Sequence, residues 1–375
     1  MKHKIHPTLN HNCDSLYVHI PFCQRICNYC DFPKYLFFNE NIEEQYLESL
    51  FKEIKYYKFK KYKTIFIGGG TPTALKENNL EKLLKFLQKY FLPDGEFSIE
   101  SNVESLTDKK IFLLKKYGVN RISIGVQALP KNLLNYLGRT HKKSEVENAI
   151  FRVKKYGIKN INLDFLYGFK GFEKKDIDEI FSFVKKVKIT HLSFYPLSIL
   201  PHTKLFNDKE KELDEKIVRE QYDYICELIK KNSFVHYEVS NFAKGKKYEC
   251  KHNLVYWNNE YYLGVGVGAC SYLHKVRISV TKNILEYVKD PIDSKEIEKL
   301  KRKDEITYFL ITNLRKIEGF SLSLFKEEFG FDFLLRKKKE IEKLQRQKLL
   351  IVKNDYMKAS KEGIILLDII LRELI

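Results

Sequence analysis

The chain has 375 residues, of which 44% are hydrophobic, and a formal net charge of +18. This length allows one large α/β domain and a smaller one, and the apolar content excludes a largely disordered protein. No run of about 18 uncharged apolar residues occurs, and the N-terminus lacks an apolar segment, so we expect neither a membrane span nor a secretory signal.

The positive charge does not by itself indicate a nucleic-acid-binding protein. Lysines are spread along most of the chain instead of forming one basic patch. We therefore expect no specific nucleic acid as a partner, and only weak attraction to anionic surfaces, with peripheral membrane contact as one outcome. Seven cysteines, three of them in one short loop, predict a reducing, cytoplasmic location.

The first apolar run, Leu16 to Ile20, predicts a strand, and a loop with three cysteines follows it. Cys23, Cys27 and Cys30 stand with three and then two residues between them. Such a loop can hold three irons of a cubic [4Fe–4S] cluster and leave the fourth iron open to a small molecule. Soft thiolates also suit zinc, but a zinc site needs a fourth Cys or His close by. A disulfide pair or inert thiols are the alternative.

Further β-rich runs follow, with amphipathic segments such as Asn41 to Tyr57 and Asn79 to Tyr90 between them. The six runs are 16–20, 64–68, 97–100, 121–125, 160–164 and 191–195. Alternating strands and helices indicate βα units and a parallel sheet. The sequence therefore predicts an α/β fold, an incomplete (β/α)6 barrel of the TIM type, with an open doubly wound sheet as the alternative.

A glycine-rich turn follows the second predicted strand. Residues 68–72 read Gly-Gly-Gly-Thr-Pro, and glycines allow backbone N–H groups to approach a ligand closely. No Gly-Lys-Ser/Thr follows, so the turn is not a Walker loop. Polar side chains also stand at or beyond later strand ends: Glu100, Gln127, Arg139 and Asp164. That end of a barrel carries the active site, so these four are candidate ligand contacts, with helix caps, loop anchors or solvated charges as the alternative.

The second half of the chain is organised differently. Residues 198–303 are less regular. We expect a long charged helix at about 209–231 and, after it, strands and loops that include a His-Asn-Leu-Val-Tyr-Trp run at 252–257. From residue 304 onward, we expect helices near 304–316, 321–329 and 334–347, a hairpin at 349–357 and an apolar helix at 361–374, and three helices with a hairpin are the outline of a winged-helix unit. We predict a partial barrel over 1–197, a region covering its mouth over 198–303, and a winged-helix-like α+β domain over 304–375.

The cysteine loop resembles the signature of the radical S-adenosylmethionine (SAM) enzymes. The wider string, Tyr17-Val-His-Ile-Pro-Phe-Cys23 through Cys30-Asp-Phe32, is similar to the branch of oxygen-independent coproporphyrinogen III oxidase and the haem chaperone HemW. The resemblance runs from about residue 16 to the C-terminus. It implies a [4Fe–4S] cluster on the three cysteines and SAM bound to the open iron through its amino and carboxylate groups.

The resemblance also implies roles for single residues. It places Gly69, Gly70 and Thr71 against the SAM amino group and the aromatic ring of Tyr29 near the adenine. The other positions that it assigns to cofactor contact are Tyr17, Glu100, Gln127, Arg139 and Asp164.

Residues 252–257 resemble the His-Asn-x-x-Tyr-Trp segment of the HemW branch. His252 is a candidate axial ligand for haem iron, because imidazole ligates haem and the neighbouring aromatic rings could flank a porphyrin. Cys250 is a rival ligand, and an ordinary buried histidine is the alternative.

Within the branch, two features favour the haem chaperones over the oxidase. Phe32 stands where the oxidase has a further cysteine, and the segment ahead of the cluster is short. Two mismatches exist: Cys270 stands where the chaperones tend to have histidine, and residues 167–171 lack their usual Leu-Pro-Gly. The sequence therefore predicts a protein that binds the cluster, SAM and haem and passes haem to an acceptor protein. Oxidative decarboxylation of coproporphyrinogen III is the alternative, and whether SAM is cleaved stays open.

Overall fold

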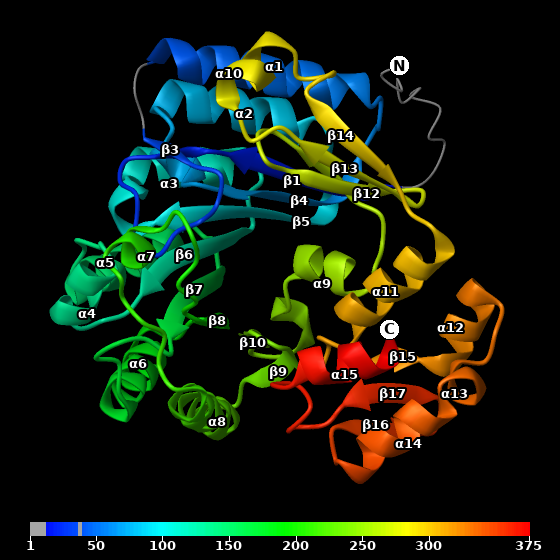
Figure 1. Ribbon diagram of the computed structural model, residues 1–375. Helices are drawn as coiled ribbons and strands as arrows, with labels where there is room; N and C mark the ends of the chain where they lie inside the picture. The colour runs from blue at the N-terminus through cyan, green and yellow to red at the C-terminus, as the bar shows by residue number, and fades with distance from the viewer. Residues whose placement is uncertain (1–12, 37–39) are drawn as a thin grey trace.

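The computed structural model describes residues 13–36 and 40–375, and a curved mixed sheet dominates it (Figure 1). This main sheet has nine strands in the order β11-β1-β4-β5-β6-β7-β8-β10-β9. The six central strands are parallel and stand in chain order: β1 (Ser15–Ile20), β4 (Tyr62–Gly69), β5 (Phe91–Asn102), β6 (Arg121–Gln127), β7 (Asn160–Tyr167) and β8 (His191–Pro196). The predicted incomplete (β/α)6 barrel is confirmed.

Alternation along each strand separates an apolar outer face from a polar inner face. In β1, Leu16, Val18 and Ile20 are fully buried under helices, whereas Tyr17 and His19 face the barrel interior. The helices that follow the strands pack on the outer face: α1 (Glu40–Tyr56), α2 (Glu77–Gln88), α3 (Asp108–Lys116), α4 (Lys131–Tyr136), α5 (Lys143–Lys155) and α6 (Lys174–Val187). The main core therefore lies between sheet and helices, and the interior is left for polar groups.

Residues 198–303 extend the sheet at both edges. β11 (Leu263–Val265) pairs in parallel with β1, and β10 (Asn241–Ala243) pairs antiparallel with β8, followed by β9 (Val235–Glu238). A second sheet contains β12 (Cys270–Leu273), β13 (Val276–Val280) and β14 (Lys295–Lys299), with α10 (Ile284–Lys289) inserted before β14. The segment thus does more than cover the barrel, because it supplies three strands of the main sheet.

The long charged helix is shorter than predicted. α8 (Glu215–Lys231) begins after Asp214, whose carboxylate accepts a hydrogen bond from the Lys216 backbone N–H at 2.8 Å. Asp214 is therefore the N-cap at which α8 begins, six residues later than predicted. The separate short helix α7 (Lys204–Asn207) precedes it.

The C-terminal part is the predicted α+β unit of helices and a hairpin. Its elements are α11 (Arg302–Asn313), β15 (Phe320–Ser321), α12 (Leu322–Phe329), α13 (Phe333–Arg336), α14 (Lys338–Arg346), β16 (Leu350–Lys353), β17 (Tyr356–Ala359) and α15 (Leu367–Leu374). A single helix was expected over 334–347, but Lys337 leaves helical geometry and divides it into α13 and α14. The last helix begins at 367 instead of 361.

The parts of the chain are joined by backbone pairing. The Val239 N–H donates to Arg315 O at 3.0 Å and the Ile317 N–H to Tyr237 O at 3.1 Å, so the C-terminal unit continues from the edge of the barrel. The boundaries at 197 and 303 stay predictions. Within residues 13–36 and 40–375, every helix is too short or too polar to span a bilayer. We expect no secretory signal at the N-terminus, and residues 1–12, on which this prediction depends, lie outside the described residues.

Candidate cluster and cofactor site

The three cysteines follow the C-terminal end of β1: Cys23 ends the short strand β2 (Phe22–Cys23), and Cys27 and Cys30 lie on the loop between β2 and β3 (Tyr35–Leu36). Cys23 is buried, and Cys27 and Cys30 are half-buried. The Asn28 N–H donates to Leu137 O at 3.1 Å, and the Asn28 side chain donates to Tyr136 O at 2.8 Å. These bonds hold the loop against the end of α4, so its position is set by the barrel.

The surroundings of the thiols fit a [4Fe–4S] cluster. A Cβ on Gly70 would lie 2.9 Å from Cys23 Sγ, so only glycine leaves this sulfur uncrowded. In the described part of the chain, no three His, Cys, Asp or Glu side chains gather as ligands around one metal ion. Cys23, Cys27 and Cys30 are free thiols, and iron–sulfur clusters are held by cysteine thiolates. Cys23, Cys27 and Cys30 would hold the cluster, which supplies, when bound, one iron open to a non-protein ligand.

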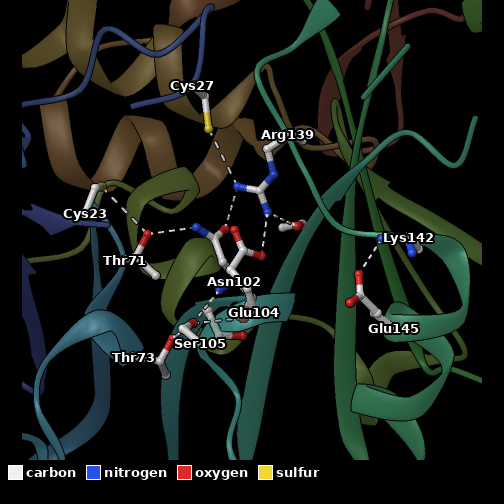
Figure 2. A network of polar contacts seen from close by, with 12 residues as sticks. Cys23, Cys27, Thr71, Thr73, Asn102, Glu104, Ser105, Arg139, Lys142 and Glu145 are labelled. Atoms are coloured by element: carbon white, nitrogen blue, oxygen red, sulfur yellow. Dashed lines mark hydrogen bonds and ion pairs between the residues drawn. The ribbon is translucent and has the colours of Figure 1, made fainter. Parts of the chain in front are cut away.

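Arg139 lies at the centre of a polar network that joins two of the thiols (Figure 2). It is 4% exposed; Nη1 donates to Asn102 Oδ1 at 2.8 Å and Nη2 to Gly125 O at 2.8 Å. Nη1 also lies 3.6 Å from Cys27 Sγ, and Asn102 Nδ2 donates to Thr71 Oγ1, which lies 3.7 Å from Cys23 Sγ. Arg139 Nε has no hydrogen-bond partner among the described residues. The guanidinium therefore puts a buried positive charge beside the thiolates that a cluster requires.

The glycine-rich turn at the end of β4 packs directly on β1. Gly69 has φ +113°, and a Cβ there would lie 2.6 Å from the His19 ring. The backbone N–H groups of this turn are already used: Gly69 donates to Glu100 Oε2 at 3.0 Å, Gly70 to Ile20 O and Thr71 to Phe22 O. An amino group needs acceptors, so contact with a SAM amino group would use carbonyl or hydroxyl oxygens of the turn.

Glu100 on β5 and Asp164 on β7 line the same interior cavity, with β6 between their strands. Asp164 accepts hydrogen bonds from Ser123 Oγ and Asn162 Nδ2, both at 2.7 Å. Burial, together with the charge of Asp164, raises the pKa of Glu100 to about 8, and burial raises the pKa of Asp164. Both carboxyl groups line an interior cavity of about 200 Å³. A cationic or hydroxyl-bearing ligand would satisfy this pair of acids.

The remaining predicted SAM contacts lie at the end of β6, on the cluster loop and in the barrel interior. Gln127 ends β6 with φ +69°, and its amide nitrogen lies 3.0 Å from where a Cβ on Gly125 would be. A non-glycine residue in the left-handed region is typical of functional sites. Tyr29 packs on the core, and burial raises the pKa of its hydroxyl well above its usual value. The charge of Cys27 raises this pKa further, whereas that of Arg139 lowers it. Tyr17 lines the interior cavity.

His252 lines the same interior cavity as Tyr17, Glu100 and Asp164, from α9 (Lys251–Trp257), a short helix where a loop or strand was expected. Glu96 accepts hydrogen bonds from the first N–H groups of this helix, including that of His252 at 3.2 Å. The His252 ring is fully buried; Nδ1 bonds Thr64 Oγ1 at 2.7 Å and Nε2 bonds Tyr256 OH at 2.8 Å. Burial lowers its pKa to about 3. Ligation of haem iron by His252 stays a prediction, and it requires that the ring leave one of these partners.

The rival ligand Cys250 is also enclosed. It is 2% exposed, and its Sγ donates to Glu96 Oε1 at 3.4 Å. Burial raises the pKa of the thiol well above its usual value. Cys270 is exposed and lies 3.7 Å from Ser279 Oγ.

Sequence reasoning missed Asn102 and His19, although a signal for both exists. Side chains two positions apart on a strand share a face. Asn102 stands two residues after Glu100, and His19 two residues after Tyr17, so both belong to the inner face that the predicted residues define. Glu96 also shares this face, four residues before Glu100, but its partner helix is more than 150 residues away in the sequence and could not be predicted.

Comparisons with known proteins agree with this geometry. The model of the Radical SAM superfamily matches residues 17–184, and the HemN C-terminal domain matches residues 300–366. "Heme chaperone HemW" of Lactococcus lactis is 36% identical over 349 residues, 90% of each chain. The protein of that name from Bacillus subtilis is 34% identical over 84% of this chain and 87% of its own.

Among solved structures, coproporphyrinogen III oxidase (HemN) from Escherichia coli aligns with a TM-score of 0.83. The alignment covers 96% of this chain and 89% of that one at 21% identity, so it shows a shared fold. The identity to the HemW proteins is higher and extends over most of both chains. We conclude that this chain belongs to the radical SAM superfamily and, within it, to the HemW family.

Proposed function

We propose that this protein is a haem chaperone that binds a [4Fe–4S] cluster, SAM and haem and delivers haem to an acceptor protein in the cytoplasm. The observation that carries the proposal is the 36% identity, over 90% of both chains, to a protein named heme chaperone. Phe32, which stands where the oxidase of the branch has a further cysteine, supports the same choice.

Cys23, Cys27 and Cys30 hold the cluster in this proposal, and the surrounding polar residues bind SAM. The acid pair Glu100 and Asp164 suits a ligand with a positive sulfonium and ribose hydroxyls, because each acid gains a partner when the ligand binds. The other proposed SAM contacts are Tyr17, Tyr29, Gly69, Gly70, Thr71, Gln127 and Arg139.

The test is a haem titration of anaerobically reconstituted protein. Iron and sulfide are counted first, haem is added stepwise while the absorbance is followed, and unbound haem is removed by gel filtration. We expect about one haem per chain, and transfer of that haem to apomyoglobin as a model acceptor. Protein that carries its cluster but takes up no stoichiometric haem would remove the chaperone function.

Two variants separate the parts of the proposal. A triple Cys→Ser variant of the cluster loop tests whether haem uptake depends on the cluster. His252→Ala tests the predicted axial ligand: loss of the haem absorbance maximum without loss of the cluster supports ligation, and an unchanged haem spectrum contradicts it.

The oxidase reaction is the second candidate, and the shared fold with HemN over 96% of the chain is the observation that favours it. It predicts that coproporphyrinogen III incubated with SAM under reducing conditions gains vinyl groups and releases CO2. SAM cleavage without a vinyl product would reject it.

A further inference from the structure

A column of aromatic rings on the inner wall of the barrel leads from α9, across β4 and β1, to the cluster loop. The His252 and Phe66 rings are stacked, with centroids 5.3 Å apart and planes 25° apart. The Phe66 and Tyr17 rings, opposite each other on β4 and β1, are stacked at 6.2 Å and 26°. We call these three residues, with His19 above them, the column.

The lower end of the column is fixed by hydrogen bonds. Thr64 Oγ1 and Tyr256 OH hold the two ring nitrogens of His252, and Glu96 caps the helix that carries it. The ring contacts Tyr256 edge-on, with centroids 5.1 Å apart. The His252 ring is therefore held in one orientation, stacked on Phe66.

The upper end of the column reaches the cluster loop. Tyr17 OH lies 3.0 Å from His19 Nδ1, and His19 Nε2 lies 2.9 Å from the carbonyl oxygen of Pro33, three residues after Cys30. Gly69 of the glycine-rich turn packs on the same His19 ring, since a Cβ there would lie 2.6 Å from it. A displacement of Tyr17 would thus move both segments that surround the cluster.

We propose that His252 is a positioning residue for the cluster loop, acting through Phe66, Tyr17 and His19. Aromatic stacking and the hydrogen bonds of His19 to Tyr17 and Pro33 transmit its position from α9 to the cluster loop. A change that turns the His252 ring away from its partners loosens the loop that holds Cys30. The inference rests on the cluster and not on haem transfer, so a negative haem titration leaves it standing.

The test compares His252→Ala with His191→Ala in anaerobically reconstituted protein. His191 is a matched control: it is 1% exposed, lies on the inner face of β8, and bonds Asn162 and Tyr237 at 2.7 and 2.8 Å through its two nitrogens. Its ring contact is with Tyr237 and not with the column. The readouts are the rate at which bathophenanthroline disulfonate strips iron from the cluster, and the EPR spectrum of the reduced cluster without SAM.

We expect His252→Ala to lose iron about fivefold faster than the wild type, the effect of removing one aromatic pair. Its EPR signal should shift or broaden, whereas His191→Ala should match the wild type in both measurements. His252→Phe keeps a ring under Phe66 and should restore most of the resistance to the chelator.

Phe66→Leu provides an independent test if His252→Ala does not fold. It interrupts the column while His252 keeps its hydrogen bonds, and it should also accelerate iron loss. The double variant should be no faster than the faster single variant, because both changes break one path. Equal rates in His252→Ala and His191→Ala would overturn the proposal. So would independent, additive effects of the two column variants, or a His252→Phe variant as labile as His252→Ala.

Discussion

Replacing Glu100 with Gln should remove part of the pH dependence of SAM binding. Burial and the neighbouring Asp164 raise the pKa of Glu100 to about 8. The carboxyl group is therefore mostly protonated at pH 7 and ionised at pH 9, and only the ionised form attracts the positive sulfonium of SAM. About a tenth of the protein is ionised at Glu100 at pH 7 and about nine tenths at pH 9, so the apparent Kd should fall about tenfold over this interval.

The assay is equilibrium SAM binding to cluster-loaded protein at pH 7, 8 and 9. The amino group of SAM titrates in the same range, because α-amino groups have a pKa of about 8. The wild type should therefore show both contributions, whereas Glu100→Gln should keep only that of the ligand. Gln retains an oxygen that can accept the Gly69 N–H bond, so the turn is preserved.

Asp164→Asn is the companion variant. Removing the charge of Asp164 should lower the pKa of Glu100 and move the gain in affinity toward lower pH. The reasoning is refuted if wild type and Glu100→Gln gain affinity in parallel between pH 7 and 9. It is also refuted if Asp164→Asn leaves the midpoint where it was.

Three further predictions concern the framework of the site. Gly69→Ala should lower the iron and sulfide content after reconstitution, since the added Cβ would lie 2.6 Å from the His19 ring. Gly245→Ala is the control: it has a similar positive φ, +97°, but no described atom lies within 4 Å of the added Cβ. Lys295→Met should lower the free energy of unfolding, measured by denaturant titration, by about 3–5 kcal/mol. It removes the ammonium group that lies 2.8 Å from the buried Glu53 carboxylate and so leaves this charge without its counter-ion. Adding Glu53→Gln should recover part of that loss, and a double variant no more stable than the single one would contradict the argument. Arg139→Lys should weaken SAM binding about tenfold, because one ammonium cannot replace two hydrogen bonds from a planar guanidinium; unchanged affinity would show that the network does not support the site.

Much of the fold could be predicted because the responsible signals are local. Leu16, Val18 and Ile20 alternate with polar residues, and this pattern recurs between amphipathic helices. The ends of parallel strands meet at one edge, so the inner-face positions Glu100 and Asp164 could be brought together without coordinates. The structure confirms this arrangement of strands.

The features that could not be predicted depend on partners far apart in the chain. β11 is three residues long and contains Gly264, so its sequence does not show that it joins the main sheet, where the edge of β1 offers it hydrogen bonds. The sequence leaves His252 as either a candidate haem ligand or an ordinary buried histidine. Glu96 and Thr64 bury it, and neither is near it in sequence.

The amino-acid sequence alone determined the chemistry of the cluster loop and the order of the parallel strands, because thiol spacing and strand alternation are properties of neighbouring residues. Tertiary structure decided where His252 lies and how it connects to the loop. Burial of an imidazole and stacking of rings from β1, β4 and α9 arise only when the curved sheet brings these segments together. Packing, and not residue type, therefore decides which partners the His252 ring has.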